Sequence, residues 1–264
     1  MNNIMIIIFF LFLNFFLFFN LNKISKLIKI FDYPDNIRKI HNQKVPLVGG
    51  IFFLINIFAY LLIEIFFITN GNFFLNKSEV LSFFLGSLFF FILGFYDDKY
   101  KLTPNIKLIF SIIIIYICLN ISDKFIVTDL RFLFLDSEFN LNNLSIYFTI
   151  FCILVFLNSF NMIDGINGLS VSYFVICIIY IFSFSFLNIF FYCLLICAFF
   201  FLINNFRNRI FLGDNGSLLL GFILSLFFIK EYNERNIYAD QIIALMILPG
   251  IDMVRVAVQR SIKK

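Results

Sequence analysis

The sequence predicts an all-α membrane protein, a bundle of about nine transmembrane helices with its functional groups on one face. The first observation is composition: 62% of the 264 residues are hydrophobic, 14% are charged, and the mean hydropathy is +0.99. A soluble domain is about 45–50% apolar and about 25% charged. The composition therefore excludes a water-soluble globule, a disordered chain, a disulfide-stapled secreted scaffold and a nucleic-acid-binding protein.

The second observation is the length of the apolar runs. A spanning helix needs about 20 mostly apolar residues, because the hydrocarbon core is about 30 Å thick and each helical residue rises about 1.5 Å. The candidate spans cover residues 4–21, 46–69, 80–96, 106–121, 145–160, 168–186, 188–205, 217–230 and 240–258. The eighth is the shortest. No soluble domain separates them, so we expect residues 1–264 to form a single integral membrane domain.

The third observation is the distribution of lysine and arginine among the loops. The loops after odd-numbered spans hold 15 of the 20 basic residues. Basic loops stay on the cytoplasmic side of a membrane. We therefore expect these loops to be cytoplasmic and the N-terminus to lie outside.

Four aspartates stand at the ends of apolar runs on the predicted cytoplasmic face, beside glycine or another carboxylate: Asp97, Asp98, Asp164 and Asp214. The acidic residues of the opposite side are expected in solvated loops: Glu79, Asp123, Asp129, Asp136, Glu138, Glu231, Glu234 and Asp240. Any one aspartate could simply be a solvated loop end. The four together predict a shared site. The five cysteines lie in apolar runs without a CxxC pair, so we expect buried free thiols.

The segment 94–98 ends the third run with two adjacent carboxylates, Asp97 and Asp98. Adjacent carboxylates repel each other, so the pair requires a cation or shares a proton. Mg²⁺ prefers oxygen ligands and commonly takes one or two carboxylates together with substrate phosphates. The pair favours a divalent-cation site, although an Asp-Asp dipeptide alone is a weak signal.

The segment 158–169 closes the fifth run with Asn158, Asn161, Asp164 and Asn167, where apolar residues would otherwise continue. Polar groups at this depth are costly unless they face a cavity or one another. The accompanying glycines permit a tight, non-helical backbone that can approach a ligand. A structural loop is the alternative, but this density of polar residues favours a functional site.

The segment 211–217, which reads Phe-Leu-Gly-Asp-Asn-Gly-Ser, precedes the eighth run. The free N–H groups and positive dipole end of a helix start suit a phosphate. Asp214, between flexible residues, favours a metal ligand. A helix N-cap is the alternative for Asp214 and fits Ser217 equally well.

The first predicted cytoplasmic loop carries Arg38, Lys39, His41 and Lys44 into a Pro/Gly-rich helix entry. This composition suits a phosphate-lined mouth, and positive-inside anchoring explains it equally well. His41 is the only histidine in the chain. A general-base role for it would rest on residue type alone.

Together these motifs resemble those of the polyprenyl-phosphate N-acetylhexosamine-1-phosphate transferases, glycosyltransferase family 4. The form of residues 46–50 favours the bacterial undecaprenyl-phosphate GlcNAc-1-phosphate transferase branch over the more distant phospho-MurNAc-pentapeptide translocases. The motifs follow the family's order over residues 32–260 and read Asp32-x-Pro34…Arg38-Lys39-x-His41…Pro46-Leu47-Val48-Gly49-Gly50, Gly94-x-x-Asp97-Asp98, Asn158-x-x-Asn161-x-x-Asp164-Gly165 and Phe211-x-Gly213-Asp214-x-Gly216-Ser217.

The resemblance implies an inner-membrane enzyme that transfers sugar-1-phosphate from a UDP-N-acetylhexosamine, with UDP-GlcNAc the expected donor, to undecaprenyl phosphate and releases UMP. Asp97 and Asp98 would orient or deprotonate the lipid phosphate, Asn167 would meet the uracil, and Phe211 would stack on it. The implied catalytic residues are Asp97, Asp98 and Asp164; the ligands of Mg²⁺, or alternatively Mn²⁺, are Asp214 and Asn161; the substrate-binding residues are Lys107, Asn158, Asn167, Phe211, Arg38 and His41. A homodimer is left open.

Two departures from the family pattern bear on activity. Asn167 stands where many bacterial members have aspartate, so we expect altered contacts there. The chain ends at Lys264, whereas the family continues with a cytoplasmic His-rich loop and a further membrane helix. We therefore expect a fragment or a reduced member of the family.

Two other functions compete with the enzyme. A non-catalytic homologue that binds the lipid carrier or scaffolds a glycan pathway is supported only by the absent His-rich loop. A transporter with a carboxylate proton relay is disfavoured, because the carboxylates lie at one face rather than at the midplane.

Overall fold

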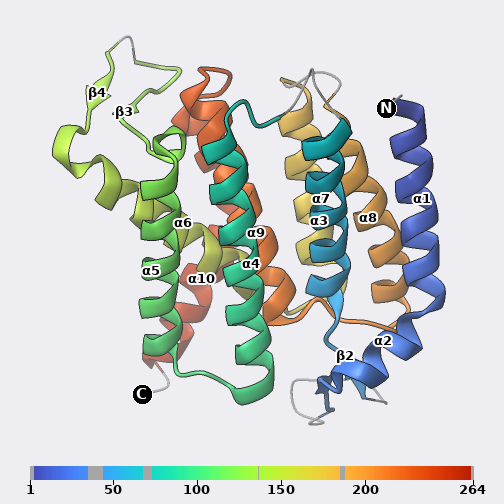
Figure 1. Ribbon diagram of the computed structural model, residues 1–264. Coiled ribbons are helices and arrows are strands. Elements are labelled where there is room, and N and C mark those ends of the chain that lie inside the picture. Colours follow the sequence, from blue (N-terminus) through green and yellow to red (C-terminus); the bar gives the residue numbers. More distant parts are fainter. Residues whose placement is uncertain (1–2, 35–43, 68–72, 136, 185–187, 263–264) are drawn as a thin grey trace.

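The computed structural model describes residues 3–34, 44–67, 73–135, 137–184 and 188–262, and it is built mainly from helices (Figure 1). The helices are α1 (Asn3–Phe19), α2 (Leu21–Ile28), α3 (Gly49–Phe67), α4 (Lys77–Tyr100), α5 (Pro104–Ile121), α6 (Ser145–Ile163), α7 (Leu169–Phe182), α8 (Ile189–Phe206), α9 (Gly213–Asn233) and α10 (Ala239–Ile262). In the described part of the chain, each predicted apolar run coincides with one of these helices. The short helix α2 is additional.

Six helical segments of the described residues are long and apolar enough to cross a membrane. They correspond to α3, α4, α5, α6 with the turn before it, α8 and α9. Helices α1 and α7 are apolar but shorter. The prediction of a polytopic helical membrane bundle is confirmed, whereas the crossing of the membrane by all nine helices stays a prediction.

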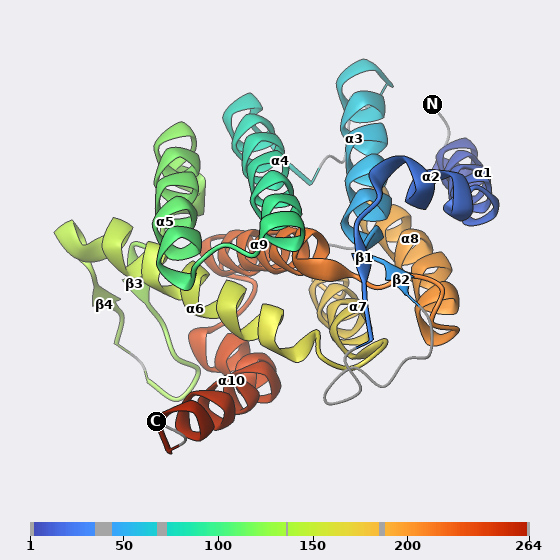
Figure 2. The same cartoon turned by 90° about the horizontal axis from the view of Figure 1, so that it is seen from below.

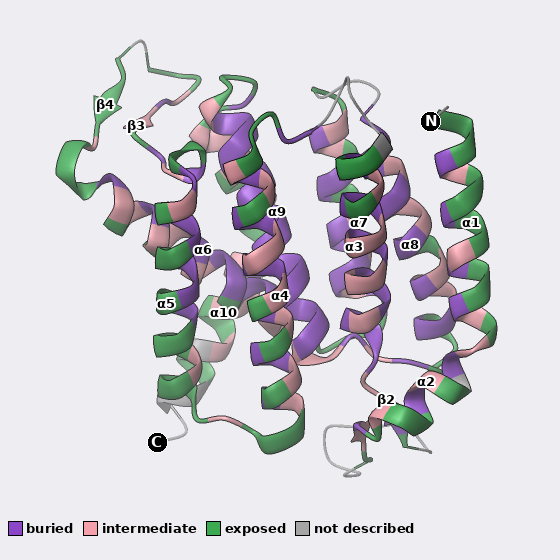
Figure 3. Ribbon diagram, viewed as in Figure 1, coloured by how far each residue is buried: buried purple, intermediate pink, exposed green. Residues whose placement is uncertain are grey.

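Helix α9 lies at the centre of the bundle and is packed by α3, α4, α6 and α7 (Figure 2). In its spanning window 94% of the residues are buried, against 28–56% in the other five spans, and Figure 3 shows the contrast with α5. The predicted run covered only residues 217–230, because polar residues interrupt the apolar pattern at both ends. Protein surrounds these residues in place of lipid, so the helix extends further in both directions.

The two ends of the bundle carry different groups. The last turns of α4 and α6 lie at one end with the first turns of α5 and α9 (Figure 1). We call this the carboxylate end, since Asp97, Asp98, Asp164 and Asp214 lie there. The opposite end, the hairpin end, carries the N-terminus of α1 and the hairpin of β3 (Asp129–Leu130) and β4 (Phe139–Asn140). The four aspartates therefore lie at the same end of the bundle, and the cytoplasmic location of that end stays a prediction.

Two short antiparallel hairpins depart from the all-helical prediction. Besides β3 and β4, β1 (Phe31–Asp32) pairs with β2 (Val45–Pro46), with Phe31 opposite Pro46. The chain after β2 is tied to the segment before α9: Phe211 N donates to Pro46 O at 3.0 Å, and Gly49 N donates to Phe211 O at 3.1 Å. These bonds bring the 46–50 motif to the start of α9.

The hairpin end holds buried charges that we expected in solvated loops. Glu79 and Glu231 are 1% and 0% exposed. The expectation is wrong for both residues. For Glu79 the reason is Lys230 of α9, whose Nζ lies 2.8 Å from Glu79 Oε2 and supplies the opposite charge inside the bundle. The five cysteines are free, as expected, and all except Cys152 are buried.

Candidate active site

The carboxylate end is organised around one lysine. Lys107 Nζ of α5 lies 2.6 Å from Asp97 Oδ2 at the end of α4 and 3.0 Å from Asp214 Oδ2 at the start of α9. The turn between α4 and α5 fixes this geometry, because Leu102 N donates to Asp97 Oδ1 at 2.8 Å and Pro104 starts the next helix. Lys107 and two of the motif aspartates, Asp97 and Asp214, are thus brought together.

Asp98 has a different environment from its neighbour Asp97. Its Oδ1 accepts from Asp214 N at 2.9 Å, and its Oδ2 accepts from Asn215 N at 3.0 Å and from Asn215 Nδ2 at 2.5 Å. Asp98 therefore holds the first turn of α9 against α4. The expectation that this helix start offers free N–H groups to a phosphate is wrong for these two groups, because Asp98 already occupies them.

Glycines allow the backbones to come this close. A Cβ at Gly94 of α4 would lie 2.2 Å from Asp214 O, and one at Gly50 of α3 would lie 2.1 Å from Asn215 Oδ1. Asn215 Oδ1 accepts from Gly50 N at 2.8 Å. Asn215, which we did not single out from the sequence, thus joins α3, α4 and α9 at the site.

Asn161 of α6 completes the contacts of Asp214. In the amide orientation that satisfies its neighbours, its nitrogen donates to Asp214 Oδ1 at 2.8 Å and faces Ser217 Oγ at 2.5 Å. Its oxygen then accepts from Lys107 Nζ at 3.2 Å. Four helices, α4, α5, α6 and α9, therefore contribute side chains to one polar cluster.

Asp164 lies just after α6 and is partly buried. Burial raises the pKa of its carboxyl to about 8; the charges of Asp214 and Asp98 also raise it, and the hydrogen bond from Ser170 opposes the shift. Ser170 Oγ donates to Asp164 Oδ1 at 2.5 Å. With no cation bound, a carboxyl with this pKa is mostly protonated at neutral pH. The negative charges of Asp214 and Asp98 therefore act on the Asp164 carboxyl and favour its protonated form.

Hydrogen bonds join the loop after α6 to the segment that precedes α9. Asn205 Oδ1 accepts from Gly168 N at 2.5 Å, and Asn205 Nδ2 donates to Ile210 O at 2.8 Å. Asn167 Nδ2 donates to Asn208 Oδ1. The loop with Asn167 and the segment with Phe211 thus adjoin each other, as a shared nucleoside site would require. The two asparagines that join them, Asn205 of α8 and Asn208 just after that helix, carried no sequence signal.

Asn158 and Phe211 are the remaining predicted site residues that the structure describes. Asn158 is exposed one turn before Asn161, and its amide donates to Leu154 O of its own helix at 3.0 Å. Phe211 is partly buried, and its backbone joins the 46–50 motif. Arg38 and His41 lie outside the described residues.

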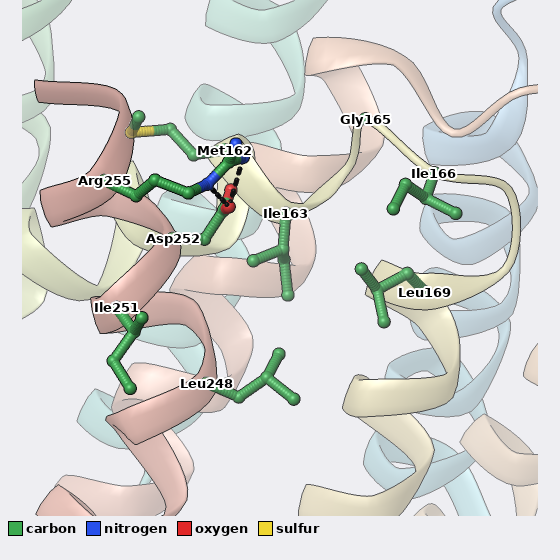
Figure 4. A pocket seen from close by; sticks show the side chains of 9 residues that line it. All are labelled: Met162, Ile163, Gly165, Ile166, Leu169, Leu248, Ile251, Asp252 and Arg255. Carbon is green, nitrogen blue, oxygen red and sulfur yellow. Dashed lines mark hydrogen bonds and ion pairs between the residues drawn. The ribbon is translucent and has the colours of Figure 1, made fainter. Parts of the chain in front are cut away.

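A cavity of about 480 Å³ opens between α10 and the loop after α6 (Figure 4). Met162, Gly165 and Leu169 line one side. Ile251 and the ion pair of Asp252 with Arg255, whose atoms lie 2.6 Å apart, line the other. Neither charged residue was predicted from the sequence as part of a site, because a helical Asp-Arg pair three residues apart is an ordinary surface pattern.

The charge balance at this end favours a cation. Among the described residues, Lys107 is the one cation that lies within ion-pair distance of any of the four aspartates, and it pairs with Asp97 and Asp214. No three of the described histidine, cysteine, aspartate and glutamate side chains converge as a complete metal site. Asp214 and Asn161 supply two oxygens, which fits Mg²⁺ because that ion usually relies on one or two protein ligands and takes the rest from substrate phosphates and water.

Comparison with known proteins identifies relatives over most of the chain. The chain is 28% identical over 252 residues to the undecaprenyl-phosphate alpha-N-acetylglucosaminyl 1-phosphate transferase of Escherichia coli (strain K12), covering 90% of this chain and 65% of that protein. A probable undecaprenyl-phosphate N-acetylglucosaminyl 1-phosphate transferase of Bacillus subtilis is 25% identical over 257 residues, covering 92% of this chain and 67% of the relative.

A phospho-N-acetylmuramoyl-pentapeptide-transferase of Staphylococcus epidermidis is 28% identical over 199 residues, or 68% of this chain and 60% of the relative. The chain thus spans about two thirds of the length of these curated relatives. The model of glycosyl transferase family 4 matches residues 80–231, which include most of α4, the Asp97–Lys107–Asp214 cluster and most of α9. The match covers more than half of the sequence, and the chain belongs to glycosyl transferase family 4.

Proposed function

We propose that this chain transfers N-acetylhexosamine-1-phosphate, with GlcNAc-1-phosphate the first choice, from a UDP-sugar to undecaprenyl phosphate as the initiating step of a cell-surface polysaccharide. The names of the relatives from E. coli and B. subtilis support the acceptor and the transferred group. The observation that carries the proposal is the convergence of Asp97, Lys107 and Asp214 from three helices at one end of the bundle.

In the proposed reaction an oxygen of the lipid phosphate attacks the sugar-linked phosphorus of the UDP-sugar. The new phosphorus–oxygen bond forms as the bond to UMP breaks, which leaves polyprenyl-diphospho-sugar and UMP. Phosphoryl transfer relies mainly on positioning and on neutralising charge in the transition state. A lysine held by two carboxylates, at the meeting point of several helices, suits both requirements.

Within this reaction we assign different tasks to the two adjacent aspartates. Asp97 contacts Lys107 and is placed to orient or deprotonate the lipid phosphate together with it. Both carboxylate oxygens of Asp98 accept hydrogen bonds from α9, and Asp98 thereby positions Asp214. Asp164 lies beside them and can hold a proton near neutral pH.

We assign Mg²⁺ to Asp214 and Asn161, with Mn²⁺ as an alternative. When bound, a divalent cation supplies charge neutralisation on the donor pyrophosphate. Lys107 occupies the space between the carboxylates in the chain alone, which shows that this space accepts a positive charge. The Asn161 oxygen, now facing Lys107 Nζ, lies in the same cluster.

We assign the uridine of the donor to the two hydrogen-bonded segments that carry Asn167 and Phe211, with Phe211 stacking on the base. Lys107 would contact phosphate, and Asn158 would contribute from the exposed side of α6. Arg38 and His41 belong to the first predicted cytoplasmic loop and complete the proposed substrate-binding set.

The proposed setting is a bacterial inner membrane with the carboxylate end in the cytoplasm. In a background without the five native cysteines, Lys101→Cys should react only with a reagent on the cytoplasmic side. Ser137→Cys, at the hairpin end, should react only from outside. Labelling of both positions from the same side would refute this orientation.

The function is tested by release of radiolabelled UMP from UDP-GlcNAc by the purified chain with undecaprenyl phosphate. We expect release that requires both the lipid phosphate and Mg²⁺, and a weaker rate with other UDP-N-acetylhexosamines. Binding of the lipid carrier without release of UMP would instead show a non-catalytic protein. The matched control is Asp214→Asn, which should bind the lipid but release UMP about a hundredfold more slowly or slower still.

A further inference from the structure

The hairpin end presents a run of apolar side chains that the bundle does not cover. Leu133, Phe134 and Leu135, between β3 and β4, are 64%, 74% and 40% exposed. We call these three residues the apolar tip. Large apolar side chains exposed side by side mark a surface that contacts a partner or a membrane.

The apolar tip is held in place at its base. Arg131 N donates to Tyr232 Oη at 2.6 Å, and Tyr232 Oη donates to Asp129 O at 3.0 Å. The guanidinium of Arg131 pairs with Asp129 at 2.8 Å and lies over the Tyr232 ring at 4.4 Å from its centroid. Ala239 N donates to Arg131 O at 2.9 Å. The chain therefore enters the tip from a fixed position at the ends of α9 and α10.

The apolar tip continues the exposed apolar face of α10. Leu133 N donates to Asp240 Oδ1 in the first turn of α10 at 2.9 Å. Ile243, Ile247 and Ile251, which follow at one-turn intervals, are 57%, 54% and 64% exposed. In Figure 2 the hairpin lies beside α6 and α10, at the side of the bundle rather than over its centre. The tip thus lies at the level where the exposed apolar face of α10 begins.

We propose that the apolar tip inserts into the membrane interface on the side opposite the carboxylates and fixes the hairpin end against the bilayer. The polar side of the same hairpin supports this orientation, since Ser137 is exposed and Glu138 pairs with Arg235 at 3.0 Å. One side of the hairpin is therefore charged and the other apolar, which is the pattern of an interfacial element.

The test uses a property of the sequence, which contains no tryptophan. Phe134→Trp places a single fluorophore at the tip of the full chain. The protein is reconstituted into phosphatidylcholine vesicles with bromine atoms near the headgroup or deep in the acyl chains. We expect strong quenching by the shallow bromines, weaker quenching by the deep ones, and little quenching by aqueous iodide.

Two matched variants calibrate the result. Ser137→Trp, on the polar side of the same hairpin, should be quenched by iodide and not by either lipid. Tyr147→Trp, at an exposed position of α6 (71% exposed), should respond to brominated lipid. If Phe134→Trp behaves like Ser137→Trp, the tip lies in water and the proposal fails. Protection from both quenchers would show that protein covers the tip, either a second copy or a partner, and would also overturn it.

Discussion

The two ends of the bundle each hold a lysine between two carboxylates. At the carboxylate end Lys107 lies between Asp97 and Asp214, and at the hairpin end Lys230 lies 2.8 Å from both Glu79 and Glu234. The similarity ends there, because the surroundings of the two lysines differ in accessibility and in charge.

At the hairpin end the charges around Lys230 are paired. The Lys230 and Glu79 side chains are 5% and 1% exposed, and Asn76 Nδ2 donates a further hydrogen bond to Glu79 at 3.0 Å. At the carboxylate end the Asp214 side chain is 35% exposed, and Asp98 and Asp164 add acidic groups without an ion-pair partner of their own among the described residues. The same arrangement of residues is therefore structural where it is closed, and suited to chemistry where it is open and has further acidic groups beside it.

The largest effect should come from removing a charge at the open end. Asp214→Asn should lower the rate of UMP release by about a hundredfold or more, since loss of a charged ligand removes several kcal/mol of transition-state stabilisation and each 1.4 kcal/mol is tenfold. The protein should remain folded and membrane-inserted. Turnover near wild type in excess Mg²⁺ would reduce Asp214 to a helix cap and remove the contrast between the ends.

The closed end should show the larger effect on stability. Lys230→Met leaves Glu79 buried without a counter-charge, and breaking a buried pair in this way costs about 3–5 kcal/mol. Lys107→Met should cost less, because its partners are more exposed. Denaturant unfolding of both variants in the same detergent checks the difference. Equal destabilisation would show that both lysines are structural.

Two variants at the open end should separate donor binding from chemistry. Phe211→Ala should weaken UDP-sugar binding by roughly fivefold to a hundredfold, because stacking of a base on an aromatic ring contributes about 1–3 kcal/mol. Asp98→Asn should leave that affinity nearly unchanged and lower the rate, because Asp98 positions α9 and not the nucleotide. Calorimetry and single-turnover rates measure the two effects. The opposite pattern would mean that the donor and acceptor sites are assigned to the wrong loops.

A further test of the open end concerns pH. The carboxyl of Asp164 has a pKa of about 8, above its ordinary value of 3.8, so the folded state binds its proton more tightly than the unfolded state. This contribution to stability is complete below pH 4 and is lost as the pH rises towards 8. In EDTA, wild type should lose stability over this range relative to Asp164→Asn. Parallel stability curves for the two proteins would contradict the assignment.

The sequence predicted the helices and the convergence of the motif residues well, since both depend on local patterns. It could not distinguish Asp97 from Asp98, because successive helical residues point about 100° apart and only the packing of α5 and α9 against α4 decides which of them meets Lys107. It also placed Glu79 in water, because the partner that buries it, Lys230, lies 151 residues further along the chain. Asn205 and Asn215 carried no signal, since their task is to join backbone segments that are distant in sequence.

The burial of α9 has a consequence for biosynthesis. This helix is the least hydropathic of the six candidate spans and is the one most enclosed by protein. During synthesis α3 to α8 emerge before α9. Asp98 can therefore accept its hydrogen bonds from Asp214 N and Asn215 N only after α9 has been made. We expect the insertion of α9 to depend on helices that are already in the bilayer. A nascent chain that ends before α9 would leave Asp98 without its hydrogen-bond donors and Lys107 without Asp214.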